Sequence, residues 1–152
     1  MDLIDKAILT HLQRNASMPV SEIADAVGLS QTPCWRRIKK LEDDGIIARR
    51  VALIDKSAAN LRLTAFVSVK TADHSDGWLR DFSQRVSNIP EVVELHRMSG
   101  EVDYLLKVVC PDMPRFDEIY KKLISSTKFA DVTSTFSMEE LKQTSELPLQ
   151  YL

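Results

Sequence analysis

The fold is decided by the stretch SEIADAVGLSQTPCWRRIKKLEDDGII, residues 21–47. Apolar side chains at helical spacing predict a short helix over residues 20–27, a tight turn, and a second helix that ends at Gly45. Gly28 suits the left-handed position that follows a helix, and Ser30 suits the cap that begins the next one. Two helices joined in this way, the second rich in arginine and lysine, form a helix-turn-helix, which enters the major groove of DNA.

The second helix separates an apolar face from a cationic one. Cys34, Ile38 and Leu41 share one side, which we assign to the core. At about 100° per residue, polar and cationic side chains lie roughly opposite, with one arginine on the flank. Polar side chains near the start of such a helix read base edges, and cations bind phosphate. The predicted DNA contacts on this helix are Gln31, Thr32, Arg36, Arg37, Lys39 and Lys40.

Residues 46–55 alternate apolar and polar side chains, which predicts a two-stranded wing. On this wing, Arg49 and Arg50 are expected to touch the DNA backbone or minor groove, the alternative being a role in solubility alone. Cys34 and Trp35, on or near the core side of the second helix, also need a predicted role. We interpret Cys34 as a small apolar core residue rather than a redox switch. We expect Trp35 to be a half-buried anchor, with stacking on DNA sugars as the alternative.

Composition fits a protein with one charged face. The chain has 152 residues, 44% of them hydrophobic, and its formal net charge is −2. Residues 30–56 carry seven Lys/Arg against four Asp/Glu, a local charge of +3. The two cysteines lie far apart without a Cys-x-x-Cys, and there is no signal peptide or apolar run of membrane length. We therefore expect a soluble cytoplasmic protein that does not bind membranes.

After a polar linker the periodicity changes to that of an α+β domain. The predicted elements are a strand over 63–70, a helix over 77–88, strands over 92–98 and 104–110, a helix that is capped by Asp112 and contains Phe116, Ile119, Tyr120, Leu123 and Ile124, and a strand over 132–138. This order is the ferredoxin-like βαββαβ unit. The predicted domains are a winged helix-turn-helix over 1–55, a linker over 56–62, and a ferredoxin-like domain over 63–152. The last twelve residues either pack across a neighbour or fray.

The hairpin SGEVDY, residues 99–104, is the second candidate site. Gly100 allows a tight turn and a close approach of a ligand to the backbone. Backbone N–H groups in a turn bind a carboxylate, and Asp103 offers a partner for an ammonium. Together they fit a zwitterionic amino acid, the alternative being an ordinary hairpin turn. The predicted effector-binding residues are Met98, Gly100, Glu101, Val102, Asp103, Tyr104, and, on the last strand, Thr133, Ser134 and Thr135.

The sequence does not predict an enzyme. Its four glycines are dispersed, so no phosphate-binding glycine loop is present. Its three histidines fall on three different predicted elements, without the spacing of a zinc site, and there is no nucleophile elbow. We expect no catalytic residues, no metal and no cofactor.

The two motifs in this order resemble the Lrp/AsnC family of bacterial and archaeal transcription regulators. Residues 32–47 resemble the family's recognition helix and turn, and residues 99–104 resemble the Gly-x-x-Asp loop of its ligand-sensing domain. The resemblance implies a sequence-specific regulator of double-stranded DNA, homodimers often stacked into octamers, and an amino acid as effector. It also implies that the effector changes DNA affinity or assembly.

Two copies would place two recognition helices about one turn of DNA apart, so we expect a roughly palindromic operator. One alternative is an architectural DNA-binding protein that wraps DNA without an effector. Another is a small amino-acid-binding enzyme or an enzyme's regulatory subunit, against which the lack of a catalytic constellation argues.

Overall fold

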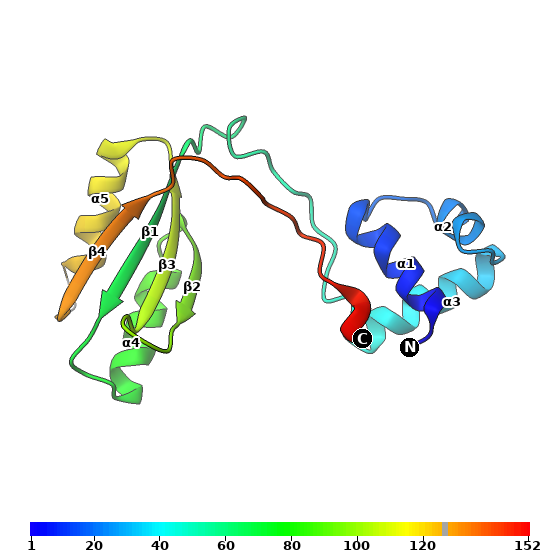
Figure 1. Cartoon of the computed structure of the whole chain (residues 1–152), viewed down its shortest axis with the longest axis horizontal. Helices are drawn as coiled ribbons and strands as arrows, with labels where there is room; N and C mark the ends of the chain where they lie inside the picture. Colours follow the sequence, from blue (N-terminus) through cyan, green and yellow to red (C-terminus); the bar gives the residue numbers. More distant parts are fainter. Residues whose placement is uncertain (126–127) are drawn as a thin grey trace. The chain divides into compact units, whose positions relative to one another are not determined.

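The computed structural model describes residues 1–125 and 128–152. Contacts divide the chain into two compact units (Figure 1). The helical unit comprises Met1–Leu53 together with Lys142–Leu152, and the sheet unit comprises Ile54–Leu141. The C-terminal tail, which the sequence assigns to the second domain, therefore packs with the first. Each unit is described by itself.

The helical unit contains α1 (Leu3–Arg14), α2 (Val20–Ala26) and α3 (Gln31–Asp43). The second and third helices begin and end within about a residue or two of the predicted bounds, which is the usual scatter at helix ends. Their apolar faces meet in one core, whose buried members are Ile8, Leu9, Leu12, Ile23, Ala24, Cys34, Ile38 and Leu41. The face that periodicity assigned to the core of α3 is confirmed.

Glycines end the second and third helices. Gly28 and Gly45 have φ of +70° and +73°, the left-handed conformation predicted for Gly28. Ser30 is the N-cap of α3 with extended backbone, as expected, but its hydroxyl makes no capping hydrogen bond to a described residue. The first backbone N–H groups of α3 are therefore left without a side-chain partner.

The segment after α3 does not form the predicted hairpin. Residues 46–55 are mostly irregular, and no strand is assigned there in the described chain. Val51 and Leu53 are 57% and 76% exposed. The alternation of side chains is present, but it lacks a partner strand that would turn it into a paired wing.

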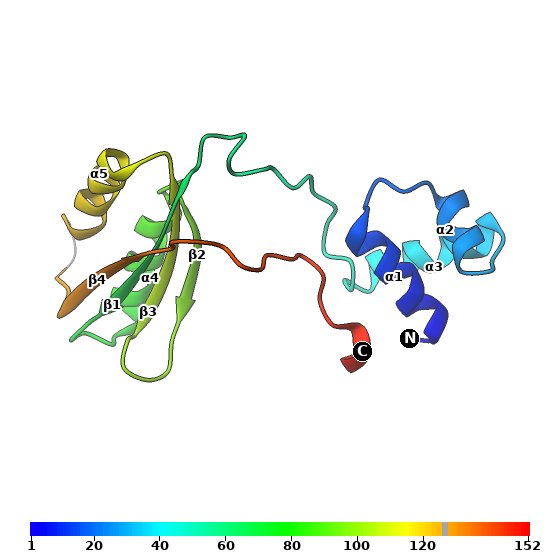
Figure 2. The ribbon, with the colours of Figure 1, turned by 45° about the horizontal axis from the view of Figure 1, so that its top comes forward.

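The C-terminal tail folds onto α1. Gln13 exchanges two hydrogen bonds with the backbone of Leu147, accepting from its N–H at 2.6 Å and donating to its carbonyl at 3.3 Å. Arg14 pairs with Glu146 at 3.1 Å. A short 3₁₀ helix, Leu149–Tyr151, places Leu149 against the core of the helical unit. Figures 1 and 2 both show this turn beside the helices.

The sheet unit has the predicted βαββαβ order. Its elements are β1 (Leu63–Lys70), α4 (Asp76–Ser87), β2 (Val92–Arg97), β3 (Tyr104–Cys110), α5 (Met113–Ile124) and β4 (Asp131–Phe136). The strands form one antiparallel sheet in the order β2-β3-β1-β4. The last strand stops at Phe136, so Met138, predicted to continue it, is 98% exposed.

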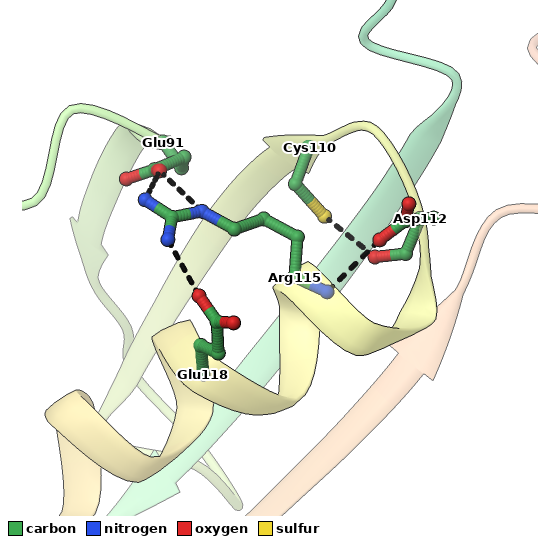
Figure 3. Close-up of polar contacts among 5 residues, drawn as sticks. All are labelled: Glu91, Cys110, Asp112, Arg115 and Glu118. Carbon is green, nitrogen blue, oxygen red and sulfur yellow. Dashed lines mark hydrogen bonds and ion pairs between the residues drawn. The ribbon is translucent and has the colours of Figure 1, made fainter.

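One face of the sheet is covered by α4 and α5 (Figure 2). Ala65, Val67 and Val69 of β1 point into this core, so the residues that alternate with them face away from the helices. The start of α5 is fastened by Arg115, whose guanidinium bonds Glu91 at 2.5 Å and Glu118 at 2.6 Å (Figure 3). The described residues include no helix long and apolar enough to cross a membrane.

Candidate functional site

The first turns of α3 present the predicted DNA-contacting face. Gln31, Thr32, Arg36, Lys39 and Lys40 are exposed. The opposite side is anchored by Cys34, Ile38 and Leu41, which are at most 5% exposed. A helix held by one apolar side and free on the other can enter a groove without disturbing its core.

The predicted cations differ in what already binds them. Lys39 pairs with Asp43 at 3.0 Å, one turn along α3, and this hydrogen bond raises the pKa of Lys39. Arg50 pairs with Glu42 at 2.9 Å and donates to the carbonyl of Ala16 at 3.3 Å. These two side chains must give up internal partners before they contact phosphate.

Arg37 is held by α1. Its Nη1 lies 2.8 Å from Asp2 Oδ2 and 2.7 Å from Asp5 Oδ1. These carboxylates raise the pKa of Arg37, with Asp5 the larger cause. The sequence placed Arg37 on the flank of α3 but did not find these partners. Asp2 and Asp5 have the three-residue spacing of a capping box at the start of α1, but this spacing does not indicate an arginine on another helix.

Arg36, Lys40 and Arg49 form no ion pair with any residue in the described chain. They are the cations most readily available to a phosphate or a base edge. Trp35 is 54% exposed and lies outside the core of the helical unit. It therefore does not anchor α3 as predicted, and the alternative contact with DNA sugars stays a prediction.

The hairpin after β2 forms a compact loop at one end of the sheet. Gly100 has φ of +123°, which glycine alone adopts without strain. Met98 donates to the carbonyl of Asp103 at 2.8 Å, and the N–H of Asp103 donates to the carbonyl of Val69 at 3.0 Å. The loop is thus fixed against the end of β1.

The carboxylate of Asp103 has a structural partner that the sequence did not reveal. Its Oδ2 accepts the backbone N–H of Thr71 at 2.8 Å, while Oδ1 has no hydrogen bond to a described residue. Glu101, also in the loop, pairs with Lys70 at 3.4 Å. Lys70 is the last residue of β1 and Thr71 follows it, so β1 ends beside this loop. One oxygen of Asp103 is therefore left for an ammonium group.

Two predicted effector contacts are placed elsewhere. Tyr104 is 3% exposed, and its ring packs on Trp78 and Phe82 at 5.5 and 5.3 Å. It is a core residue, because it begins β3 on the helix-covered face. Ser134 faces the same side, and its buried Oγ has no hydrogen-bond partner among the described residues. Thr133 and Thr135 alternate with Ser134 along β4, so their side chains lie on the open face of the sheet, opposite that of Ser134.

The remaining loop residues stay together. Met98, Gly100, Glu101, Val102 and Asp103 belong to one hairpin, and Thr133 pairs with Ser68 near the same end of the sheet. Thr135 pairs with Phe66, further along, and its hydroxyl donates to that residue's carbonyl at 3.3 Å. The candidate ligand site is therefore the hairpin with Thr133 two strands away.

Both thiols are buried, and burial raises the pKa of Cys34 and of Cys110. A buried protonated thiol is a poor nucleophile, which agrees with the assignment of Cys34 to the core. The described residues contain no cluster of three or more histidine, cysteine or acidic side chains that would hold a metal.

Comparison with known proteins shows which family combines a helix-turn-helix like α1 to α3 with a sheet domain like that of residues 63–136. Residues 1–48 match a winged helix-turn-helix DNA-binding family, and residues 64–147 match the Lrp/AsnC ligand binding domain. The chain belongs to the Lrp/AsnC family. The resemblance drawn from the two motifs is confirmed, and so is the α+β fold. As a member of the Lrp/AsnC family the chain is a DNA-binding transcription regulator and not an enzyme.

Named transcription regulators align with this chain over nearly its whole length. The DNA-binding transcriptional activator DecR of Escherichia coli (strain K12) is 46% identical over 151 residues, 99% of each protein. The glutamate uptake regulatory protein of Zymomonas mobilis is 45% identical over 149 residues, 98% of this chain and 91% of that protein.

Solved structures of Lrp/AsnC proteins have the same fold. The crystal structure of an AsnC family transcriptional regulator from Agrobacterium tumefaciens matches with a TM-score of 0.97 and 53% identity, covering 100% of this chain and 99% of that one. A transcriptional regulator of Neisseria meningitidis in complex with L-methionine matches with a TM-score of 0.94 and 36% identity, covering 99% and 98%.

Proposed function

We propose that this regulator reads operator DNA with α3 and that an amino acid bound at the hairpin of residues 98–103 changes its DNA affinity or assembly. The observation that carries the DNA half is the face of α3 on which Arg36 and Lys40 are exposed and form no ion pair with a described residue. The most direct base contacts are then Gln31, Thr32 and Arg36, while Lys40 and Arg49 bind phosphate. Lys39 and Arg50 contribute after exchanging a carboxylate for a phosphate.

The effector half is supported by the chemistry of the hairpin. One carboxylate oxygen of Asp103 has no hydrogen bond to a described residue and could accept from an ammonium, and Gly100, with φ of +123°, gives the turn a backbone that a ligand can approach closely. The Neisseria relative binds L-methionine, which is an amino acid of this chemical class. A ligand at this loop changes DNA binding only if it binds two arrangements of the protein with different affinity.

We also propose the assembly and the division of the chain. Residues 1–55 contact DNA, residues 56–62 are the linker, and the domain from residue 63 senses the effector, with the tail serving the DNA-binding half. The protein works as a homodimer that can stack further, up to an octamer, on a roughly palindromic operator. It acts in the cytoplasm, where a bacterial regulator meets the chromosome.

The test measures binding of the full-length protein to operator and random duplexes, with and without each of the twenty amino acids. Arg36→Ala should weaken operator binding by about 1–3 kcal/mol and reduce the preference for operator. Asp103→Asn keeps an acceptor for the Thr71 N–H but loses the charge that an ammonium requires. It should abolish calorimetric binding of the effector while operator binding in its absence is retained.

Asp112→Asn is the matched control, because Asp112 also accepts a backbone N–H, from Arg115 at 2.9 Å, at the opposite end of β3. It should leave the effector response intact. If the wild type binds no amino acid but binds DNA, the architectural alternative is favoured. If it binds an amino acid and no duplex even at low salt, the DNA half is rejected.

A further inference from the structure

Arg37 differs from its neighbours on α3 because its charge is committed to another helix. Its Nη1 donates to both Asp2 and Asp5, whose side chains precede and begin α1. The Asp5 side chain is 16% exposed and so is mostly shielded from water, while 33% of the Arg37 side chain stays exposed. A carboxylate buried to this extent depends on its partner, because leaving it unpaired is strongly destabilising.

The two carboxylates are used completely. Asp2 Oδ1 accepts the N–H of Asp5 at 2.9 Å, and Asp5 Oδ2 accepts the N–H of Asp2 at 3.0 Å, which forms the capping box of α1. The other oxygen of each carboxylate accepts from Arg37. The guanidinium therefore closes a cluster in which all four oxygens are bonded, and it links the start of α1 to the middle of α3.

We propose that Arg37 is a positioning residue, which fixes the rotation of α3 through Asp2 and Asp5 and so aims Arg36 and Lys40, instead of contacting DNA itself. The inference rests on the proposed role of α3 as the DNA-contacting helix. Arg37 was predicted to contact DNA, but two carboxylates at the start of α1 bind it, so we assign it to positioning instead.

Geometry supports a role in rotation. Cys34, Ile38 and Leu41 hold α3 along a single apolar side, and apolar burial is not directional. Arg37 lies to one side of that stripe and is directional, so it supplies a second point of attachment. Because α3 is one continuous hydrogen-bonded helix, a small rotation about its axis turns Arg36 by the same angle as Arg37.

Electrostatics argue against a phosphate contact. One guanidinium against two carboxylates gives the cluster a net charge of −1, which repels a phosphate group. The backbone N–H of Asp5, and then Arg37, lower the pKa of Asp2, so this carboxylate stays ionised at neutral pH. The nearest cation on the chain, Arg36, is exposed and carries no such neighbours in the described residues.

The test compares Asp5→Asn, Arg37→Gln, Arg37→Lys and the Asp5→Asn/Arg37→Gln double variant of the full-length protein. Duplex affinity is measured over a salt series, and circular dichroism melts confirm that each variant is folded. A positioning role predicts that Asp5→Asn and Arg37→Gln each weaken operator binding about tenfold, which is within the coupling expected for one ion-pair network. The double variant is then no weaker than either single one, Arg37→Lys recovers part of the affinity, and the salt slope stays that of the wild type.

Asp43→Asn is the matched control, because it removes the same charge from an ion pair confined to α3. It should leave affinity unchanged or raise it. A phosphate contact by Arg37 predicts the opposite pattern: Arg37→Gln lowers the salt slope by about one, and Asp5→Asn strengthens binding by removing a negative charge. That pattern, or wild-type affinity in all variants, overturns the inference. Arg36→Ala is measured alongside, and if it too binds as the wild type does, the proposed role of α3 fails as well.

Discussion

One arginine side chain links α5 to the sheet through Glu91, as Arg37 links α3 to α1 through Asp2 and Asp5. Arg115 follows the N-cap Asp112 and bonds Glu91, the residue before β2, through Nε at 3.1 Å and Nη2 at 2.5 Å (Figure 3). Glu91 is 17% exposed, so the pair stabilises more than a pair on the open surface. The Arg115 hydrogen bonds hold the pKa of Glu91 below its ordinary value.

Arg115→Gln is expected to lower the free energy of unfolding of the sheet unit by about 1 kcal/mol at pH 7, because the guanidinium is partly screened by solvent. A carboxyl whose pKa is lowered by folding contributes its full stabilisation of the folded state above its unfolded-state pKa. It loses that contribution as the pH falls through its folded-state pKa. The difference between variant and wild type should therefore shrink between about pH 5 and pH 3. Urea unfolding of variant and wild type at pH 7 and at about pH 3 measures this difference in the free energy of unfolding. Lys121→Gln, which removes a pair within α5, should change little at either pH.

At the scale of elements, the sequence predicted what depends on local periodicity. Asp112, Gly28 and the core stripe of α3 were placed correctly because caps and apolar spacing act within one or two turns. No strand is assigned over residues 46–55 in the described chain, because alternation there does not show whether a partner strand exists. Neither the tail nor the partners of Arg37 could be found, since their contacts join residues that lie more than thirty positions apart.

The tail is expected to stabilise the helical unit through one side chain. Leu149→Ala should lower the local stability of α1 by about 1–2 kcal/mol, less than for a fully buried leucine because Leu149 is only partly buried. Hydrogen exchange of the α1 amides measures this loss. Leu147→Ala is the control, since Leu147 is 72% exposed and should change stability by no more than about 0.5 kcal/mol. Equal exchange in both variants would mean that the tail does not support the helices.

At the scale of the whole molecule, the open face of the sheet is the side on which no described helix of the sheet unit packs. Phe66 pairs across the ladder with Lys107 and Thr135, and Ser68 pairs with Leu105, all on the side away from α4 and α5. Two apolar side chains among small polar ones, on a sheet not covered on that side by a described helix, favour association with a second copy. A dimer presents two copies of α3 to one duplex, which raises affinity by making the second contact intramolecular.

Phe66→Asp should therefore shift the protein toward the monomer and weaken operator binding by about 100-fold or more, as loss of a linked second contact allows. Binding to a half-site duplex should change little, because α3 itself is unaltered. Light scattering and duplex titration on the same samples measure both quantities. Met113→Asp is the matched control: it places the same charge on a side chain that is 51% exposed at the start of α5. A monomeric Phe66→Asp variant with undiminished operator affinity would show that one copy of α3 suffices, and a variant that stays dimeric would place the association surface elsewhere.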